Sequence, residues 1–265
     1  MSSMALKLIA IVCMIIDHTG AVLRHTMEHG ELSMTMRMVG RVAFPIFAFL
    51  IAEGMRKTRS RPNFLLWLGT FAVISIIPFS MFSTVTRWGL YISPNYFDFS
   101  YNNVFFTLFL GAGSIYAFDL IREKLKNTGK GIPGYALGLI CPVICAYAAY
   151  AINTDYSQRG VLLIFTTYLV MSIKDCRFLR VLPMVVWAHI QYAPGLLPEW
   201  VPLIGGGLRH MAVFAAVAPL LILLYDGSPG PAWLRGRFKV AFYLFYPAHM
   251  LILAGWSIYL RTPLW

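Results

Sequence analysis

The stretch that decides the fold is Ala5–Gly20, which reads ALKLIAIVCMIIDHTG and continues as an apolar run to Leu23. Its length and composition predict a membrane-spanning helix. Charged side chains in such a helix cost about 2.5–3.5 kcal/mol on insertion scales, so they are kept where they face a partner or a cavity. Asp17 and His18 are therefore candidate functional residues. The alternative is that both lie near the helix end, wetted by lipid headgroups and without a role.

The composition extends this interpretation to the whole chain. The protein has 265 residues, of which 58% are hydrophobic and 12% charged, whereas soluble domains carry about 25% charged residues. We therefore predict an all-α, polytopic transmembrane bundle that forms a single domain over residues 1–265. The net charge of +11 does not indicate nucleic-acid binding, because the basic residues collect in short loops and no arginine-rich arm is present.

The cysteines argue against a disulfide or a metal site, and the first apolar run argues against a cleaved signal peptide. Cys13, Cys141, Cys145 and Cys176 lie in predicted spans or on the basic side, and their spacing fits neither a disulfide nor a metal site. The first apolar run resembles a signal peptide, but Asp17 and His18 interrupt it and no small-residue cleavage site follows. We expect a retained first helix.

Apolar runs predict nine spans, each of about 20 residues where the run is long enough. They lie at 5–24, 35–55, 63–82, 103–121, 134–152, 160–174, 179–193, 208–225 and 240–260.

Basic residues predict the orientation of these spans. One side of the predicted topology holds Lys7 and most other cations, in the segments 56–61, 122–130, 174–180 and 235–239. The opposite side holds few, so the first side is expected to be cytoplasmic. The N-terminus is then inside and the C-terminus outside, as an odd number of spans requires.

Polar residues from several predicted spans share one depth, between the membrane midplane and the outer surface. This follows from a rise of about 1.5 Å per helical residue. The layer contains Asp17, His18, Arg41, Asn103, Thr107, Asp155, His189, Arg209, His210 and His249.

The residue types in this layer suggest roles. Neighbours on a helix point about 100° apart, so Asp17 is expected to pair with Arg41 or another cation across a helix interface and not with His18. The pair could serve catalysis or only helix packing. His18 would act as a base or handle the acyl group. His249, after Pro247, is either a site residue or an ordinary core histidine.

The second span carries its own signals around Arg41. Gly40 permits close helix approach, and Pro45 opens the backbone ladder near the charge. Glu53 and the cations Arg56, Lys57 and Arg59 follow at the cytoplasmic end. They form either an ordinary basic helix end or a mouth that attracts a polyanionic cofactor.

Several stretches together resemble the TraX family. They are Ala5–Gly20, Gly40–Gly54 (GRVAFPIFAFLIAEG), Asn103–Leu108 (NVFFTL), Asp155–Ile164 (DYSQRGVLLI) and Tyr243–His249 (YLFYPAH), in order along nearly the whole chain. The resemblance implies a polytopic inner-membrane acetyltransferase that uses acetyl-CoA and acts on the N-terminus of a conjugative pilin. It also implies a fold related to membrane acyltransferases. The matching motifs imply that the site residues are Asp17, His18, Arg41, Asn103 and His249. One departure is Ser157, at a position where the family commonly has glycine.

The leading hypothesis is acetyl transfer from cytoplasmic acetyl-CoA to an amine or hydroxyl acceptor at the outer face, such as a pilin-like peptide or an envelope glycan. His18 would deprotonate the acceptor or carry the acetyl group, and Asn103 or His249 would stabilise the oxyanion. Donor binding is assigned to Arg41, Arg56, Lys57 and Arg59. The alternatives are a proton-coupled transporter, which the same residue types would serve, and a non-catalytic envelope assembly factor.

Overall fold

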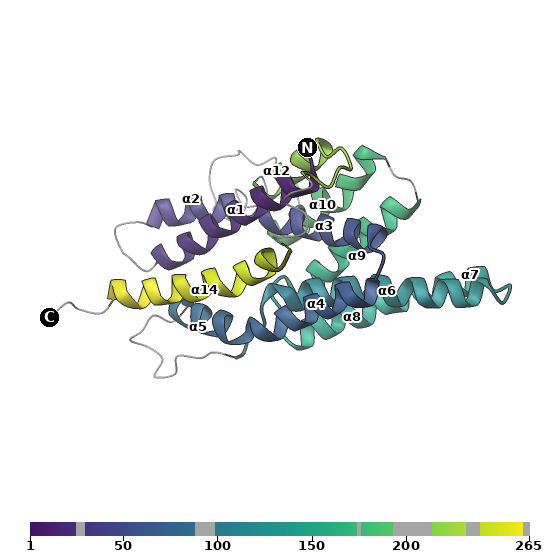
Figure 1. The fold of residues 1–265 in the computed structure, drawn as a ribbon, viewed down its shortest axis with the longest axis horizontal. Helices are drawn as coiled ribbons and strands as arrows, with labels where there is room; N and C mark the ends of the chain where they lie inside the picture. Colours follow the sequence, from purple (N-terminus) through teal and green to yellow (C-terminus); the bar gives the residue numbers. More distant parts are fainter. Residues whose placement is uncertain (25–29, 88–98, 174–175, 193–213, 232–238, 262–265) are drawn as a thin grey trace. The chain divides into compact units, whose positions relative to one another are not determined.

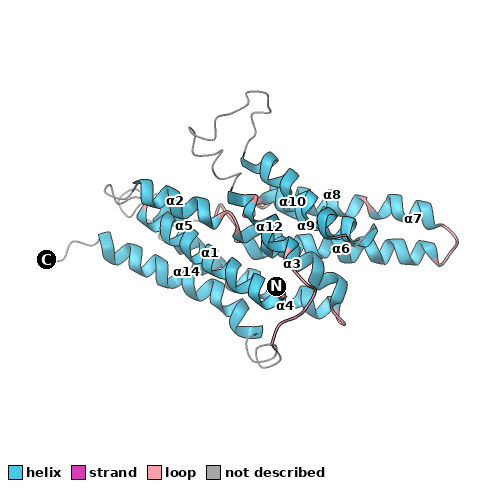
Figure 2. Cartoon of the chain, turned by 90° about the horizontal axis from the view of Figure 1, so that it is seen from above, coloured by secondary structure: helices cyan, strands magenta, loops and turns pink. Residues whose placement is uncertain are grey.

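The computed structural model describes residues 1–24, 30–87, 99–173, 176–192, 214–231 and 239–261. Every regular element in these ranges is an α-helix, and an isolated bridge joins Asn102 to Thr154 (Figure 2). The predicted all-α class is confirmed.

The chain folds as two compact units, and each unit is assembled from separate segments. Unit 1 comprises Met1–Phe47, Ser75–Phe99 and Val181–Trp265, and unit 2 comprises Ala48–Ile74 and Ser100–Arg180. Because the segments alternate along the chain, neither unit is a continuous stretch of sequence.

Unit 1 is organised around α1, which spans Ser3–Leu23 and begins after Ser2, whose hydroxyl accepts a hydrogen bond from the backbone N–H of Ala5 at 3.2 Å. Helix α1 packs against α2 and α14, and α14 packs against α5. The helices wholly within unit 1 are α1, α2 (Gly30–Gly40), α5 (Ile76–Arg87), α12 (Val217–Leu223) and α14 (Lys239–Arg261), and α10 (Arg177–Tyr192) lies mostly in it.

Unit 2 is organised around α6, which spans Val104–Lys126 and contacts α4, α7, α8 and α9 (Figure 1). Asn103 caps its N-terminus, because its side-chain oxygen accepts a hydrogen bond from the N–H of Phe105 at 3.0 Å. The other helices of this unit are most of α3 (Ala43–Lys57), α4 (Arg61–Ile74), α7 (Gly131–Gly138), α8 (Ile140–Ala151) and α9 (Ser157–Ile173).

Three predicted spans are each broken into two helices, and each break has the same cause. Proline has no N–H to donate to the carbonyl four residues earlier, and its ring clashes with that carbonyl. The breaks α2–α3, α4–α5 and α7–α8 lie three to four residues before Pro45, Pro78 and Pro142, respectively. Helices α10 and α14 instead continue through Pro183 and Pro247. The expectation that Pro45 opens the ladder near Arg41 is confirmed.

Five helical segments in the described residues are long and apolar enough to cross a membrane: Ser3–Leu23, Gly30–Lys57, Val104–Lys126, Gly131–Ala151 and Val240–Leu260. The broken pair Arg61–Ile74 and Ile76–Thr86 makes a sixth if it counts as one span. Helix α9 is apolar but shorter, and of the predicted span 208–225 the first part lies outside the described residues. The protein has the helices of a polytopic membrane protein, whereas the count of nine and the orientation stay predictions.

Ser157, the first residue of α9, has an unusual backbone conformation. Its φ is +45°, in the left-handed region that glycine occupies without steric cost, and Tyr156 before it has φ +63°. A left-handed conformation costs a residue with a side chain roughly 1–2 kcal/mol. The family departure noted in the sequence therefore falls on a backbone position that suits glycine.

We expect Ser157→Gly to stabilise the protein by about 0.5–1 kcal/mol, since relief of strain outweighs the extra chain entropy of glycine. Thermal unfolding in detergent measures the effect, with Ser157→Ala as the reference that removes only the hydroxyl. Ser172, which lies within α9, is the matched control, because a glycine in a helix interior should lower stability by about 1 kcal/mol. A Ser157→Gly protein no more stable than Ser157→Ala would contradict the argument.

Candidate functional site

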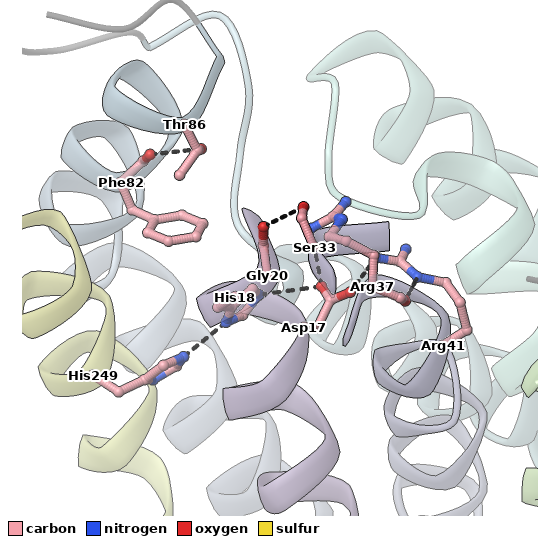
Figure 3. Close-up of polar contacts among 9 residues, drawn as sticks. All are labelled: Asp17, His18, Gly20, Ser33, Arg37, Arg41, Phe82, Thr86 and His249. Carbon is pink, nitrogen blue, oxygen red and sulfur yellow. Dashed lines mark hydrogen bonds and ion pairs between the residues drawn. The ribbon is translucent and has the colours of Figure 1, made fainter. Parts of the chain in front are cut away.

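A buried carboxylate lies at the centre of the contacts between α1 and α2. Asp17 is 8% exposed. Its Oδ1 pairs with Nη2 of Arg41, and its Oδ2 lies 3.2 Å from Nη1 of Arg37 (Figure 3). Arg41 also donates from Nε to the carbonyl of Arg37 at 3.0 Å. The predicted pairing of Asp17 with Arg41 across a helix interface is confirmed.

Two glycines allow the helices to approach closely enough for this pairing. A Cβ at Gly40 would fall on the Cβ and carboxylate of Asp17, and one at Gly20 would lie 2.8 Å from the Cβ of Met36. Ser33 on α2 donates to the carbonyl of Gly20 at 2.7 Å. The close approach expected at Gly40 is therefore confirmed, and it is the reason that the carboxylate reaches both arginines.

The two candidate histidines contact each other. Nδ1 of His18 lies 2.8 Å from Nε2 of His249, and the two rings stack with centroids 5.1 Å apart (Figure 3). Helices α1 and α14 supply one ring each. Of the two, His249 is 7% exposed, and 13% of the His18 side chain remains accessible.

The hydrogen bonds assign the proton positions of the neutral pair. Nδ1 of His249 lies 2.9 Å from the carbonyl oxygen of Phe245, which can only accept, so this nitrogen carries the proton. Nε2 of His249 must then accept from Nδ1 of His18. The remaining nitrogen, Nε2 of His18, consequently holds a lone pair, and it is the atom of the pair that can take a proton.

The surroundings of Nε2 leave it available. It lies 3.9 Å from Oδ2 of Asp17, which is too long for a hydrogen bond but close enough to stabilise a protonated ring. No described residue donates a hydrogen bond to it. The ring of Phe82 on α5 meets His18 edge-on, at 5.1 Å between centroids, and restrains its orientation.

The described charges beside His18 have a positive sum. Two arginines face one carboxylate, so Asp17, Arg37 and Arg41 together carry a formal charge of +1. A buried positive charge beside a base favours the negative oxygen that develops when a carbonyl is attacked. The arrangement can therefore support attack on an acyl group.

Asn103, a predicted site residue, lies in unit 2. Both functional groups of its amide are used by the backbone: the oxygen caps α6, and Nδ2 donates to the carbonyl of Ala72 at 2.8 Å. These contacts account for its complete burial. A catalytic role for Asn103 stays a prediction.

The predicted donor-binding cations other than Arg41 lie at the end of α3 in unit 2. Glu53, 7% exposed, pairs with Lys57 at 2.7 Å and more distantly with Arg56 at 3.8 Å. Arg59 is exposed. Glu53 thus neutralises part of the positive charge that was predicted to bind the acetyl-CoA donor. Donor binding by these cations stays a prediction.

Sequence reasoning missed two contributors to the site, Arg37 and Phe82. Arg37 lies at the start of the predicted span 35–55 and was given no site role, yet its spacing of four from Arg41 places the two on one helix face. That spacing, beside a buried acid in need of cations, was the available signal. No comparable signal marks Phe82. The polar positions Arg209 and His210 lie outside the described residues.

Comparison with known proteins agrees with the resemblance seen in the sequence. The chain is 27% identical over 269 residues to the probable fimbrial assembly protein FimC, serogroup H1, of Dichelobacter nodosus, and the alignment covers 98% of this chain and 97% of that protein. No solved structure matches the chain. The TraX protein family matches residues 2–257. Since that match covers almost the whole sequence, the chain belongs to the TraX family.

Proposed function

We propose that this protein is an inner-membrane acetyltransferase that moves an acetyl group from cytoplasmic acetyl-CoA to an amine or hydroxyl acceptor at the outer face. The observation that carries the proposal is the ordered pair His18–His249, which leaves a lone pair on Nε2 of His18 beside an excess positive charge. Membership of the TraX family supports the same reaction class.

In the proposed reaction His18 acts as the general base. The acceptor nitrogen or oxygen forms a bond to the acetyl carbon while its proton passes to Nε2 of His18. The carbon–sulfur bond then breaks, and the thiolate of coenzyme A takes up a proton. A variant of this scheme has Nε2 attack the acetyl carbon first and pass the group on.

The neighbouring residues have positioning and electrostatic roles in this proposal. His249 accepts from Nδ1 of His18 and so sets its tautomer; with both its nitrogens engaged, it orients the base, in place of the oxyanion role that the sequence suggested. Asp17 stabilises the imidazolium that forms, and Arg37 and Arg41 favour the developing oxyanion.

The acceptor class is supported by the relative, whose name describes a probable fimbrial assembly protein. A pilin-like peptide with a free N-terminus is therefore the acceptor to test first, and an amino sugar represents the envelope glycans. The membrane location follows from the apolar helices, and the inner membrane is the compartment that gives access to cytoplasmic acetyl-CoA.

Purified protein in lipid nanodiscs tests the proposal directly. With acetyl-labelled acetyl-CoA, label should pass to the peptide or the amino sugar, and free thiol should appear in equal amount. If no acceptor from a broad amine and hydroxyl panel consumes acetyl-CoA, while liposomes show pH-driven solute flux, the protein is a proton-coupled transporter and the proposal is wrong.

Replacing His249 tests the positioning role. We expect His249→Ala to lower kcat about 10–100-fold with little change in KM, because Nδ1 of His18 loses the acceptor that sets its tautomer. His249→Asn, whose side-chain oxygen can accept that proton, should recover part of the rate. His189, another histidine on a unit 1 helix, is the control, and His189→Ala should retain activity. Equal rates for the alanine and asparagine variants at position 249 would argue against tautomer control.

A further inference from the structure

A second buried carboxylate, in unit 2, organises a separate group of charges. Asp119 on α6 is 2% exposed. Its Oδ2 lies 2.7 Å from Nη1 of Arg61 on α4 and also accepts from the hydroxyl of Tyr168 on α9. Its Oδ1 lies 3.2 Å from Nη2 of Arg122, one turn further along α6. Three helices are thus tied to one carboxylate.

Further contacts restrain both arginines beside Asp119. Arg61 also donates from Nε to the carbonyl of Met55 at 3.0 Å. Arg122 stacks over the ring of Phe118, with its guanidinium carbon 5.5 Å from the centroid. The side chains of Arg61 and Arg122 nevertheless remain 27% and 34% exposed. A buried acid therefore positions two guanidinium groups that solvent can reach.

The hydrogen-bonding capacity of Arg122 is only partly used. Nη2 lies 3.2 Å from Oδ1 of Asp119 as an ion pair, but this oxygen accepts no hydrogen bond, and the other N–H groups have no hydrogen-bond partner in the part of the chain that the structure describes. Two arginines against one carboxylate leave one positive charge in excess. The planar fork of N–H donors on arginine matches the oxygens of a phosphate group.

The same end of the unit gathers further cations. Arg59, Lys124 and Lys126 are exposed, whereas Lys57 is paired with Glu53. The pairing of Arg61 with Asp119 places the basic segment 56–61 beside the basic end of α6. A phosphorylated ligand would therefore be attracted to this end before it reached the two positioned arginines.

We propose that Arg61 and Arg122, held by Asp119 and Tyr168, form a phosphate-binding site. If the phosphate is the 3′-phosphate of the coenzyme A donor, the site rests on the proposed function. The headgroup of an anionic phospholipid would supply the same chemistry. The site lies outside the set Arg56, Lys57 and Arg59 that the sequence suggested, and it differs in having a buried acid that sets the arginine geometry.

Equilibrium binding to the full-length protein in nanodiscs tests the site. The probes are coenzyme A and dephospho-coenzyme A, which lacks only the 3′-phosphate. We expect Arg122→Gln to weaken coenzyme A binding about tenfold and to leave dephospho-coenzyme A binding unchanged. Lys126→Gln is the matched control, because it removes the same charge from the same helix at an exposed position, and it should change affinity less than twofold.

Other variants and probes separate the possible results. Arg122→Lys keeps the charge and the pairing with Asp119 but removes the fork, so it should still weaken coenzyme A binding. Equal effects of Arg122→Gln and Lys126→Gln, or equal losses for both coenzymes, would overturn the proposal for the donor. If coenzyme A does not bind to the wild type, the proposed function fails separately. Native mass spectrometry with phosphatidylglycerol and phosphatidylcholine nanodiscs then tests whether the site binds a lipid phosphate. Selective loss of bound phosphatidylglycerol in Arg122→Gln supports such a site, and unchanged binding rejects it.

Discussion

Replacing His18 with alanine should lower the rate of acetyl transfer about a thousandfold while the protein remains folded. A positioned general base contributes roughly 10²–10⁴-fold to such reactions, and Nε2 of His18 is the atom of the histidine pair that holds a lone pair. The measurement is kcat for label transfer from acetyl-CoA to the best acceptor. Cys13, a buried residue on the same helix, provides the control, because Cys13→Ala changes packing without touching the pair.

The His18 experiment also separates the two chemical schemes. If His18 carries the acetyl group, wild-type protein incubated with labelled acetyl-CoA and no acceptor should retain label, and His18→Ala should not. If transfer is direct, neither protein retains label. Unchanged turnover in a folded His18→Ala protein would remove His18 from the mechanism altogether.

Replacing Gly40 with alanine should destabilise the protein by about 3 kcal/mol and abolish activity. The added Cβ would overlap the Cβ and carboxylate of Asp17. Relief requires α1 and α2 to separate, because the Cβ of Asp17 is fixed by the backbone. Overpacking of this kind costs about 1–3 kcal/mol, and disturbing a buried ion pair adds to the loss.

Gly113 is the matched control for Gly40. It lies within α6, and a Cβ there would meet nothing within 4 Å. Gly113→Ala should be neutral or stabilising by up to about 1 kcal/mol, because alanine is the better helix former. Thermal unfolding in detergent compares the two. Similar stabilities would show that the contact between Gly40 and Asp17 is less tight than the structure indicates.

Composition and the energetic cost of burying a charge predicted those features of the site that depend on the needs of a single residue. The acid Asp17 needed a cation, and Arg41 beside Gly40 was the natural candidate; the structure confirms the pairing. The sequence placed His18 and His249 at one depth but not in contact, because 231 residues separate them and depth alone does not show which helices are neighbours.

Other features of the structure that differ from the predictions have recognisable signals in the local sequence. Asn103 stands directly before an apolar run, as an N-cap residue does, and the structure uses it so. Pro45, Pro78 and Pro142 mark the carbonyls at which the helices break. The buried acid Asp119 falls within the predicted span 103–121, and Arg122, three residues further on, is the cation that helical spacing offers it.

Unit 1 draws its segments from both ends of the chain, and this determines when its polar cluster is completed during synthesis. Asp17 and Arg41 are 24 residues apart and can meet soon after the first two hydrophobic segments leave the ribosome. His249 emerges near the end of translation, so His18 lacks its hydrogen-bond partner until then. A chain truncated before α14 would therefore contain the ion pair of Asp17 and Arg41 but not the histidine pair.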